Sequence, residues 1–256
     1  RRGAIYNVDT RSKRQTAEAG VIGKFSTGAV KHRAQLSANI LKMKEGTNNT
    51  ACNYCYNTNM YDPVTPVFPN APVWNGYDKA TARTNNDFRS LALADTMGFA
   101  DDKVLLTVGG RRQSIKQPWN NYSKSRFSPM LAAVVRPWGD SVALFGNYTE
   151  GMEPGQVVGV TYANAGEVMG PRVSKQMEFG VKFQTGEMTH TVSAFEIKRP
   201  SFITNSANQL VDDGEQRLRG VEWSVYGKLT QTLSVLGGVA HIKSEQRNTG
   251  RDTYGT

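Results

Sequence analysis

Two segments, SKQMEFGVKF (174–183) and RLRGVEWSVYGKL (217–229), decide the fold of this chain. Each places an apolar side chain at every second position: Phe179, Val181 and Phe183 in the first, Val221, Trp223 and Val225 in the second. A period of two predicts a β-strand with one apolar and one polar face. The polar face carries charges in mid-strand, among them Glu178, Lys182 and Glu222. The core of a soluble β-sandwich rarely accepts such charges, whereas the wet interior of a membrane barrel does.

The composition agrees with a membrane barrel. Only alternate residues of its strands need to be apolar, so a hydrophobic content of 38% and a mean hydropathy of −0.49 suffice. No apolar run approaches the roughly 18 residues of a membrane-spanning helix. The net charge of +9 would suit a nucleic-acid binder, but Lys and Arg are spread over the strand-like segments and cluster only at residues 11–14. We therefore expect no nucleic-acid partner, and an electropositive surface that faces an anionic ligand or lipopolysaccharide.

Segments of the same alternating character recur about ten times, and short connections alternate with longer ones. The short connections, rich in Gly, Asp and Asn, fall at 27–28, 100–103, 138–140, 185–187 and 230–231. The longer connections fall at 44–86, 117–125, 152–172 and 205–214. Outer-membrane barrels place tight turns on the periplasmic side and long loops outside. The chain is therefore predicted to be all-β, an antiparallel transmembrane β-barrel segment, with a soluble Greek-key or propeller protein as the alternative.

Both ends of the chain suggest a part of a larger barrel. The basic N-terminal residues 1–14 contain no apolar stretch of the kind that a secretory signal requires. The last residues, RDTYGT, fall where an external loop is expected. An open sheet of ten strands would expose two unpaired edges within the membrane, which lipid does not tolerate. We expect further strands on both sides.

Five stretches resemble strand-turn-strand units of TonB-dependent siderophore receptors of the Gram-negative outer membrane. They are GKFSTGAVKHRAQLSANI (23–40), DDKVLLTVGGRRQ (101–113), SRFSPMLAAVVRPWGDSVALFGNYTEGMEPG (125–155), SKQMEFGVKFQTGEMTHTVSAFEIKR (174–199) and GEQRLRGVEWSVYGKL (214–229). The resemblance implies a 22-stranded barrel closed by an N-terminal plug domain, which imports ferric siderophores with energy relayed through the TonB complex. No plug and no TonB-contacting segment is recognised here, so residues 1–256 are expected to form part of a single barrel domain.

The resemblance also implies a location in the outer membrane, contact with lipid and lipopolysaccharide, and transport without covalent chemistry. The ferric siderophore would be cargo, and no cofactor is expected. A porin-like channel without a plug, or a soluble all-β binding protein, is the alternative. The residues agree that the chain is not an enzyme: Glu150 and Glu153 have no nucleophile nearby, and three isolated His give no triad or metal spacing.

Cys52 and Cys55 form a CxxC pair in the longest polar stretch. A zinc site would need two further ligands at suitable spacing, and a thioredoxin-like redox motif would need a βαβ context. In an oxidising extracellular setting a disulfide is favoured, contributing about 2 kcal/mol by closing a short loop.

Aromatic and basic residues supply the candidate ligand contacts. Tyr54, Tyr56, Tyr61 and Trp74 can stack on a planar siderophore group, or else pack the loop on itself or join an interfacial girdle. Tyr148 is a further candidate, and Trp138 beside a short turn is assigned to the girdle. Arg111 and Arg112 lead a set of cations that could line an electropositive path, with Arg136, Arg172, Lys182, Arg217 and Arg219. The alternative is that these cations pair with carboxylates such as Glu178 and Glu222.

Overall fold

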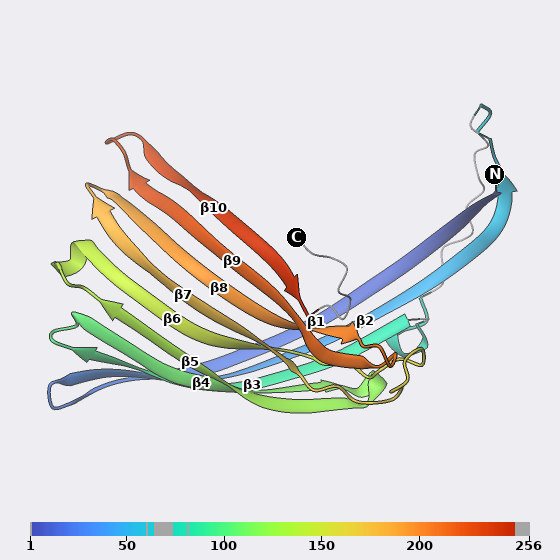
Figure 1. Ribbon diagram of the computed structural model, residues 1–256, viewed down its shortest axis with the longest axis horizontal. Coiled ribbons are helices and arrows are strands. Elements are labelled where there is room, and N and C mark those ends of the chain that lie inside the picture. The colour runs from blue at the N-terminus through green and yellow to red at the C-terminus, as the bar shows by residue number, and fades with distance from the viewer. Residues whose placement is uncertain (1, 60, 64–73, 81, 249–256) are drawn as a thin grey trace. The chain divides into compact units, whose positions relative to one another are not determined.

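A computed structural model describes residues 2–59, 61–63, 74–80 and 82–248, with the backbone alone at 2–5 and 52–55. Ten antiparallel strands follow one another in sequence order within one sheet (Figure 1). Their bounds are β1 Arg2–Thr27, β2 Val30–Asn57, β3 Ala82–Phe99, β4 Val104–Gln117, β5 Tyr122–Val135, β6 Val142–Glu153, β7 Arg172–Thr185, β8 Met188–Thr204, β9 Leu210–Lys228 and β10 Ser234–Arg247. The predicted all-β class and the ten strands are confirmed.

Three single-turn 3-10 helices complete the described elements: η1 Tyr77–Lys79, η2 Pro118–Asn120 and η3 Gly139–Ser141. Within the described residues, no helix is long and apolar enough to cross a membrane. The chain separates into two compact units. One comprises Arg1–Ala17, Ile40–Arg89 and Ile115–Ser123, and the other Glu18–Asn39, Ser90–Ser114 and Lys124–Thr256.

The short turns lie where the sequence places them. Gly28 and Gly186 open two-residue hairpin turns with φ of 61° and 60°, a left-handed conformation that favours glycine. At the turn between β3 and β4, Ala100, Asp101 and Asp102 all have positive φ. The β5–β6 turn contacts this β3–β4 turn through Arg136, whose backbone N–H donates a hydrogen bond to the Lys103 carbonyl at 2.8 Å.

Several strands are longer than the sequence indicates. β1 begins at Arg2 and not near Glu18, and β2 continues to Asn57, so the predicted loop over 44–86 is wrong in extent and the connection covers residues 58–81. The β4–β5 and β8–β9 connections are also shorter than predicted. Long connections are left between β2 and β3 and between β6 and β7, the latter at residues 154–171. Backbone pairing continues where both faces of a strand meet water, and such polar stretches carry no amphipathic signal.

Register in the second unit separates an apolar face from a polar face. Phe179 pairs with Ala194, which pairs with Val221, and Val181 aligns in the same way through Val192 with Trp223. These side chains point away from the mid-strand charges Glu178, Lys182 and Glu222 and lie open at the surface, with Phe179 67% and Val221 54% exposed. An exposed apolar face on an antiparallel sheet is typical of strands that face lipid.

Aromatic rings gather on this apolar face near the short turns. Phe183 stacks on His190 at 5.0 Å between ring centroids, and His190 lies 6.1 Å from Trp223. Near another turn, Phe25 stacks on His32 at 4.8 Å. Such rings are typical of the aromatic girdle at a membrane interface.

Candidate ligand-binding face

The polar face of β6–β9 is held by hydrogen bonds between neighbouring strands. The Asn147 amide donates to Glu178 Oε2 at 3.2 Å, and the Ser193 hydroxyl donates to Glu222 Oε1 at 3.2 Å. Ser193 is 2% exposed although it lies on the polar side of the sheet. The two mid-strand carboxylates therefore accept from neutral donors on adjacent strands, and not from the arginines that the sequence offered as partners.

Two phenylalanine rings also lie on this face, each over a glycine of the next strand. A Cβ built at Gly180 would lie 2.7 Å from Phe145 Cζ, and one at Gly220 would lie 2.6 Å from Phe195 Cζ. Register pairs both couples directly, Phe145 with Gly180 and Phe195 with Gly220. The glycines make room for the rings, which cover backbone that would otherwise be bare.

An ion cluster closes the polar face at the loop end of β6, β7 and β8. Arg199 forms a bidentate pair with Glu153, its Nε and Nη2 donating at 2.7 and 2.8 Å. Arg172 Nη2 donates to the same carboxylate at 3.1 Å, and its guanidinium carbon lies 4.9 Å from the centre of the Phe202 ring. The hydrogen bond from Arg199 holds the pKa of Glu153 below its usual range, with burial opposing and the charge of Arg199 reinforcing the effect.

Arg172 has donor capacity left over in this cluster. Its Nε is buried and has no hydrogen-bond partner among the described residues. One carboxylate thus holds two guanidinium groups, and the Asp212 carboxyl lies near enough to Arg172 for their charges to interact. Such a site is suited to a carboxylate, hydroxamate or catecholate oxygen because Arg presents a planar fork of donors.

The connection between β6 and β7 is fastened to the β8–β9 turn beside this cluster. The Asn164 amide donates to the Leu210 carbonyl at 2.9 Å, and the Leu210 N–H donates back to Asn164 Oδ1 at 3.0 Å. Val158 and Met169 pack with Leu210 in a small buried apolar cluster. The two connections therefore form one ordered rim above the ion cluster.

A hollow of about 370 Å³ lies on the polar face of the second unit and includes Arg111. It is lined by polar and small side chains, among them Gln35, Ser37, Arg111, Gln113, Ser128 and Thr149. The Thr96 and Thr107 hydroxyls, on β3 and β4, lie 2.9 Å apart and so share a face. Every second residue of β4 lies on that face, and Arg111 is four residues after Thr107. Arg111 thus lies on the polar side, and alternation places Arg112 on the opposite side.

The structure places several predicted residues off the polar face. Tyr148 pairs with Met177 on the apolar face, where its hydroxyl donates to Glu150 at 2.6 Å. Arg217 and Arg219 share a face with Val221 and pair with Glu196, so the prediction that they line the interior is wrong.

The first unit holds the other aromatic candidates. Trp74 meets Tyr77 edge-on at 5.1 Å, and the Arg11 guanidinium lies 4.9 Å from the centre of the Trp74 ring. Tyr56 is half-buried, whereas Tyr61 is 91% exposed. The side chains of Tyr54, Cys52 and Cys55 lie outside the described part of the structure, so stacking by Tyr54 and the disulfide remain predictions.

Sequence reasoning missed the ion cluster. The sequence offers Glu153 only as a neighbour of Glu150, and no motif points to Arg199 or to Ser174, whose hydroxyl lies 3.4 Å from Glu153 Oε1. Glu153 and Arg199 stand 46 positions apart, and only the pairing of β6 with β7 and of β7 with β8 brings them together. The alternation within each strand places Glu153 with Asn147, and Arg199 with Ser193, on the polar side. This alternation is the one sequence signal that could have indicated that the two residues share a face.

Known proteins share the sequence pattern and the strand arrangement of this chain. The family model for the TonB dependent receptor-like β-barrel matches residues 4–256. The chain belongs to this family. Among curated relatives it is 30% identical, over 92% of its length, to "Ferrichrome receptor FcuA" of Yersinia enterocolitica, and 25% identical to "Ferrichrome outer membrane transporter/phage receptor" of Escherichia coli. It covers 34% and 31% of those two proteins, and so spans about a third of their length.

Solved structures agree. The ferric preacinetobactin receptor BauA of Acinetobacter baumannii superposes with a TM-score of 0.74 at 32% identity, covering 93% of this chain and 37% of that one. The ferric-catecholate import receptor Fiu of Escherichia coli, at 17% identity and a TM-score of 0.75, shares the fold. The chain is thus part of an outer-membrane β-barrel of a Gram-negative bacterium, and because its family consists of receptors, it is not an enzyme.

Proposed function

We propose that the whole protein to which this chain belongs is an outer-membrane receptor that imports a ferric siderophore. The named ligands of the relatives support this proposal, since ferrichrome, preacinetobactin and ferric catecholates are all iron chelates. The TonB complex would supply the energy through a part of the protein outside this chain. The siderophore would be the cargo, with no further cofactor.

One observation carries the proposal to particular residues: the polar face ends in a cluster of two guanidinium groups, and the buried Arg172 Nε has no hydrogen-bond partner among the described residues. Arg172 and Arg199 share Glu153, and Arg111 lines a hollow on the same face. Ferric chelates present oxygen atoms and commonly carry negative charge, which these donors suit. We assign initial capture to the rim of the two fastened connections and to this cluster. In the first unit, Tyr56, Tyr61 and Trp74 stay candidate stacking residues on their own.

The test is iron-limited growth and uptake of radiolabelled iron in a strain from which the gene has been deleted. Individual ferric siderophores are supplied one at a time, and the strain is complemented with the wild-type gene or with an Arg199→Ala variant. We expect that at least one ferric siderophore is no longer taken up, that the wild-type gene restores uptake, and that the variant restores it incompletely. Undiminished uptake of every siderophore would count against the proposal.

A second arm separates a receptor from a porin-like channel. In a strain that lacks TonB, or after a protonophore collapses the inner-membrane potential, uptake through an energised receptor stops. Diffusion through a channel would continue at its former rate. Protein levels in the outer membrane are measured in parallel, so that a loss of uptake reports on transport.

A further inference from the structure

Phe202 lies where the pairing of β8 with β9 is irregular. At this point β8 has one residue and β9 has two, Asp212 and Asp213; the regular pairs on either side are Ser201–Gly214 and Ile203–Val211. An irregularity of this kind is a β-bulge, which re-aims side chains and is common beside functional sites. The bulge lies at the loop end of the two strands, and its phenylalanine reaches the ion cluster of Glu153, Arg172 and Arg199.

The Phe202 ring supports the Arg172 guanidinium. The guanidinium carbon lies 4.9 Å from the ring centre, a distance at which the face of an aromatic ring attracts a cation. Glu153 contacts the same group, because Arg172 Nη2 donates to Glu153 Oε2 at 3.1 Å. A ring and a carboxylate therefore restrain one guanidinium group together, and they fix where its planar fork of donors lies.

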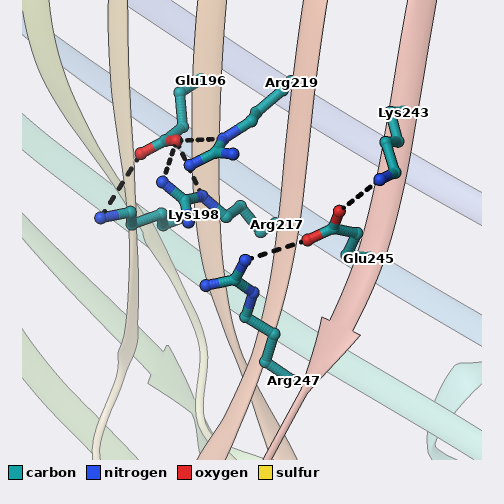
Figure 2. Close-up of polar contacts among 7 residues, drawn as sticks. All are labelled: Glu196, Lys198, Arg217, Arg219, Lys243, Glu245 and Arg247. Atoms are coloured by element: carbon teal, nitrogen blue, oxygen red, sulfur yellow. Dashed lines mark hydrogen bonds and ion pairs between the residues drawn. The ribbon is translucent and has the colours of Figure 1, made fainter. Parts of the chain in front are cut away.

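This arrangement differs from the arginine cluster on the other face of the same strands. Figure 2 shows Arg217 and Arg219 there, where both donate to Glu196. Within the described part of the second unit, Arg172 is the one arginine whose guanidinium lies at such a distance from an aromatic ring. A carboxylate is thus the general partner of arginine in these strands, and the ring is particular to Arg172.

The Phe202 ring is itself held by the rim. It packs against the buried apolar cluster of Val158, Met169 and Leu210. Val158 and Met169 come from the β6–β7 connection, and Leu210 begins β9. The ring therefore connects the two fastened connections to the guanidinium, and packing determines its own place. Side chains locked in this way hold a binding group more precisely than a long side chain holds itself.

Arg172 occupies a position that needs such support. Its Nε is buried without a hydrogen-bond partner among the described residues, which is unfavourable, so other contacts must keep the group in place. The Arg172 side chain is 21% exposed, and the Arg199 side chain is 45% exposed. Arg172 is thus the more constrained of the two arginines, with a small part left for contact with a ligand.

We propose that Phe202 is a positioning residue of the ligand-binding site, whose ring holds the Arg172 guanidinium ready to bind a negatively charged oxygen of the ferric siderophore. This inference rests on the proposed function. Phe202 acts through Arg172 and does not have to touch the siderophore. A group that is ordered before binding loses less conformational entropy when the siderophore arrives, so affinity depends on the ring. The aromatic face has this role, and apolar volume alone does not.

The test titrates the full-length protein in detergent with iron(III) complexes and follows intrinsic fluorescence. The probes are ferrichrome, ferric citrate, a ferric tris-catecholate and the ferric siderophore that the deletion strain no longer takes up. The probe that wild type binds most tightly is used for all variants. Phe202→Leu keeps an apolar side chain for the rim but removes the aromatic face, and should bind about fivefold or more weakly than wild type. Phe202→Tyr restores a ring and should bind within about twofold of wild type.

The matched control is Phe195→Leu, the same substitution on the same strand and the same face. The Phe195 ring covers Gly220, and no cation is described over it. This variant should bind as wild type does, and a loss equal to that of Phe202→Leu would overturn the proposal. Heat modifiability on electrophoresis shows that each variant folds.

A double variant tests whether the ring acts through Arg172. Arg172→Gln should bind weakly, and Arg172→Gln/Phe202→Leu should bind within about twofold of Arg172→Gln alone, because no cation is left to position. Multiplied effects of the two changes would show that the ring acts independently and would overturn the proposal. Equal losses in Phe202→Leu and Phe202→Tyr would also overturn it.

Two outcomes separate this inference from the proposed function. If Arg172→Gln and Arg199→Ala bind weakly while Phe202→Leu binds as wild type does, only the positioning role is wrong. If all three variants bind as wild type does, the ion cluster is not the binding site, and both proposals fail.

Discussion

Two adjacent positions in β10 test the assignment of the faces, because they differ in face and hardly in depth. Val239 is 67% exposed and pairs with Trp223 on the apolar face, whereas Ala240 pairs with Glu222 on the polar face. An arginine at Val239 would project into hydrocarbon near mid-height of the apolar band. This should cost about 2 to 4 kcal/mol of folding free energy, which is the range for cations near the bilayer midplane on the lipid face of such barrels.

An arginine at Ala240 should behave differently. It would lie opposite the Glu222 carboxylate on the wet side, where the substitution should change the folding free energy by less than about 1 kcal/mol in either direction. The two variants therefore differ by roughly 2 kcal/mol or more although they are sequence neighbours. Val and Ala differ in size and in strand propensity, but the propensity scale spans only about 1 kcal/mol, so most of a difference of about 2 kcal/mol or more reports the solvent that each face meets.

The measurement is guanidinium unfolding of the full-length protein in lipid vesicles, followed by tryptophan fluorescence. Val239→Arg should unfold at a clearly lower denaturant concentration, and Ala240→Arg close to wild type. Equal destabilisation by both, or the reverse order, would refute the face assignment.

Three further predictions follow from the polar face. The pKa of Glu153 lies below its usual value of 4.5, so its ion pair with Arg199 should persist at pH 5 and weaken as the pH falls through the lowered pKa. At pH 4.5, pepsin should therefore cut residues 154–171 more readily in the Glu153→Gln variant than in wild type. Equal cutting of the two proteins would contradict this. Gly180→Val should lower the thermal midpoint through clashes with the Val192 carbonyl oxygen and the Phe145 ring. Phe145→Ala should restore the part of the loss that the ring causes, and no restoration would show that the ring does not contribute. Arg111→Gln should weaken binding of an anionic ferric siderophore about fivefold or more in intrinsic fluorescence titrations while leaving the thermal midpoint unchanged, and unchanged binding would remove Arg111 from the site.

The strand cores could be predicted from sequence because lipid on one side and water on the other impose a strict period of two. Val181 and Trp223 follow that rule, and the turn residues Gly28 and Gly186 mark where strands reverse. The strand ends could not be predicted, because this contrast between lipid and water is lost there. Past the lipid boundary both faces meet water, so β1 before Glu18 and β2 after Lys44 carry no alternation although their backbones continue to pair.

The candidate site on the polar face was only partly predictable. Arg111 follows from alternation, but the partners of Glu153 depend on register across three strands, which turn lengths determine and side-chain patterns do not. Arg217 and Arg219 show the opposite case. Counting by twos from Val221 already places them on the apolar side, and their charge alone suggested the interior.

The most direct test of the account is site-directed spin labelling along β9 of the full-length protein in lipid vesicles. Single cysteines are placed at successive positions from Arg219 to Leu229, with Cys52 and Cys55 replaced by serine. Labels at Val221, Trp223 and Val225 should be relaxed mainly by lipid-soluble oxygen, and labels at Glu222 and Ser224 by a water-soluble nickel chelate. A profile without a period of two, or one of opposite phase, would contradict the division into a lipid-facing apolar face and a water-facing polar face.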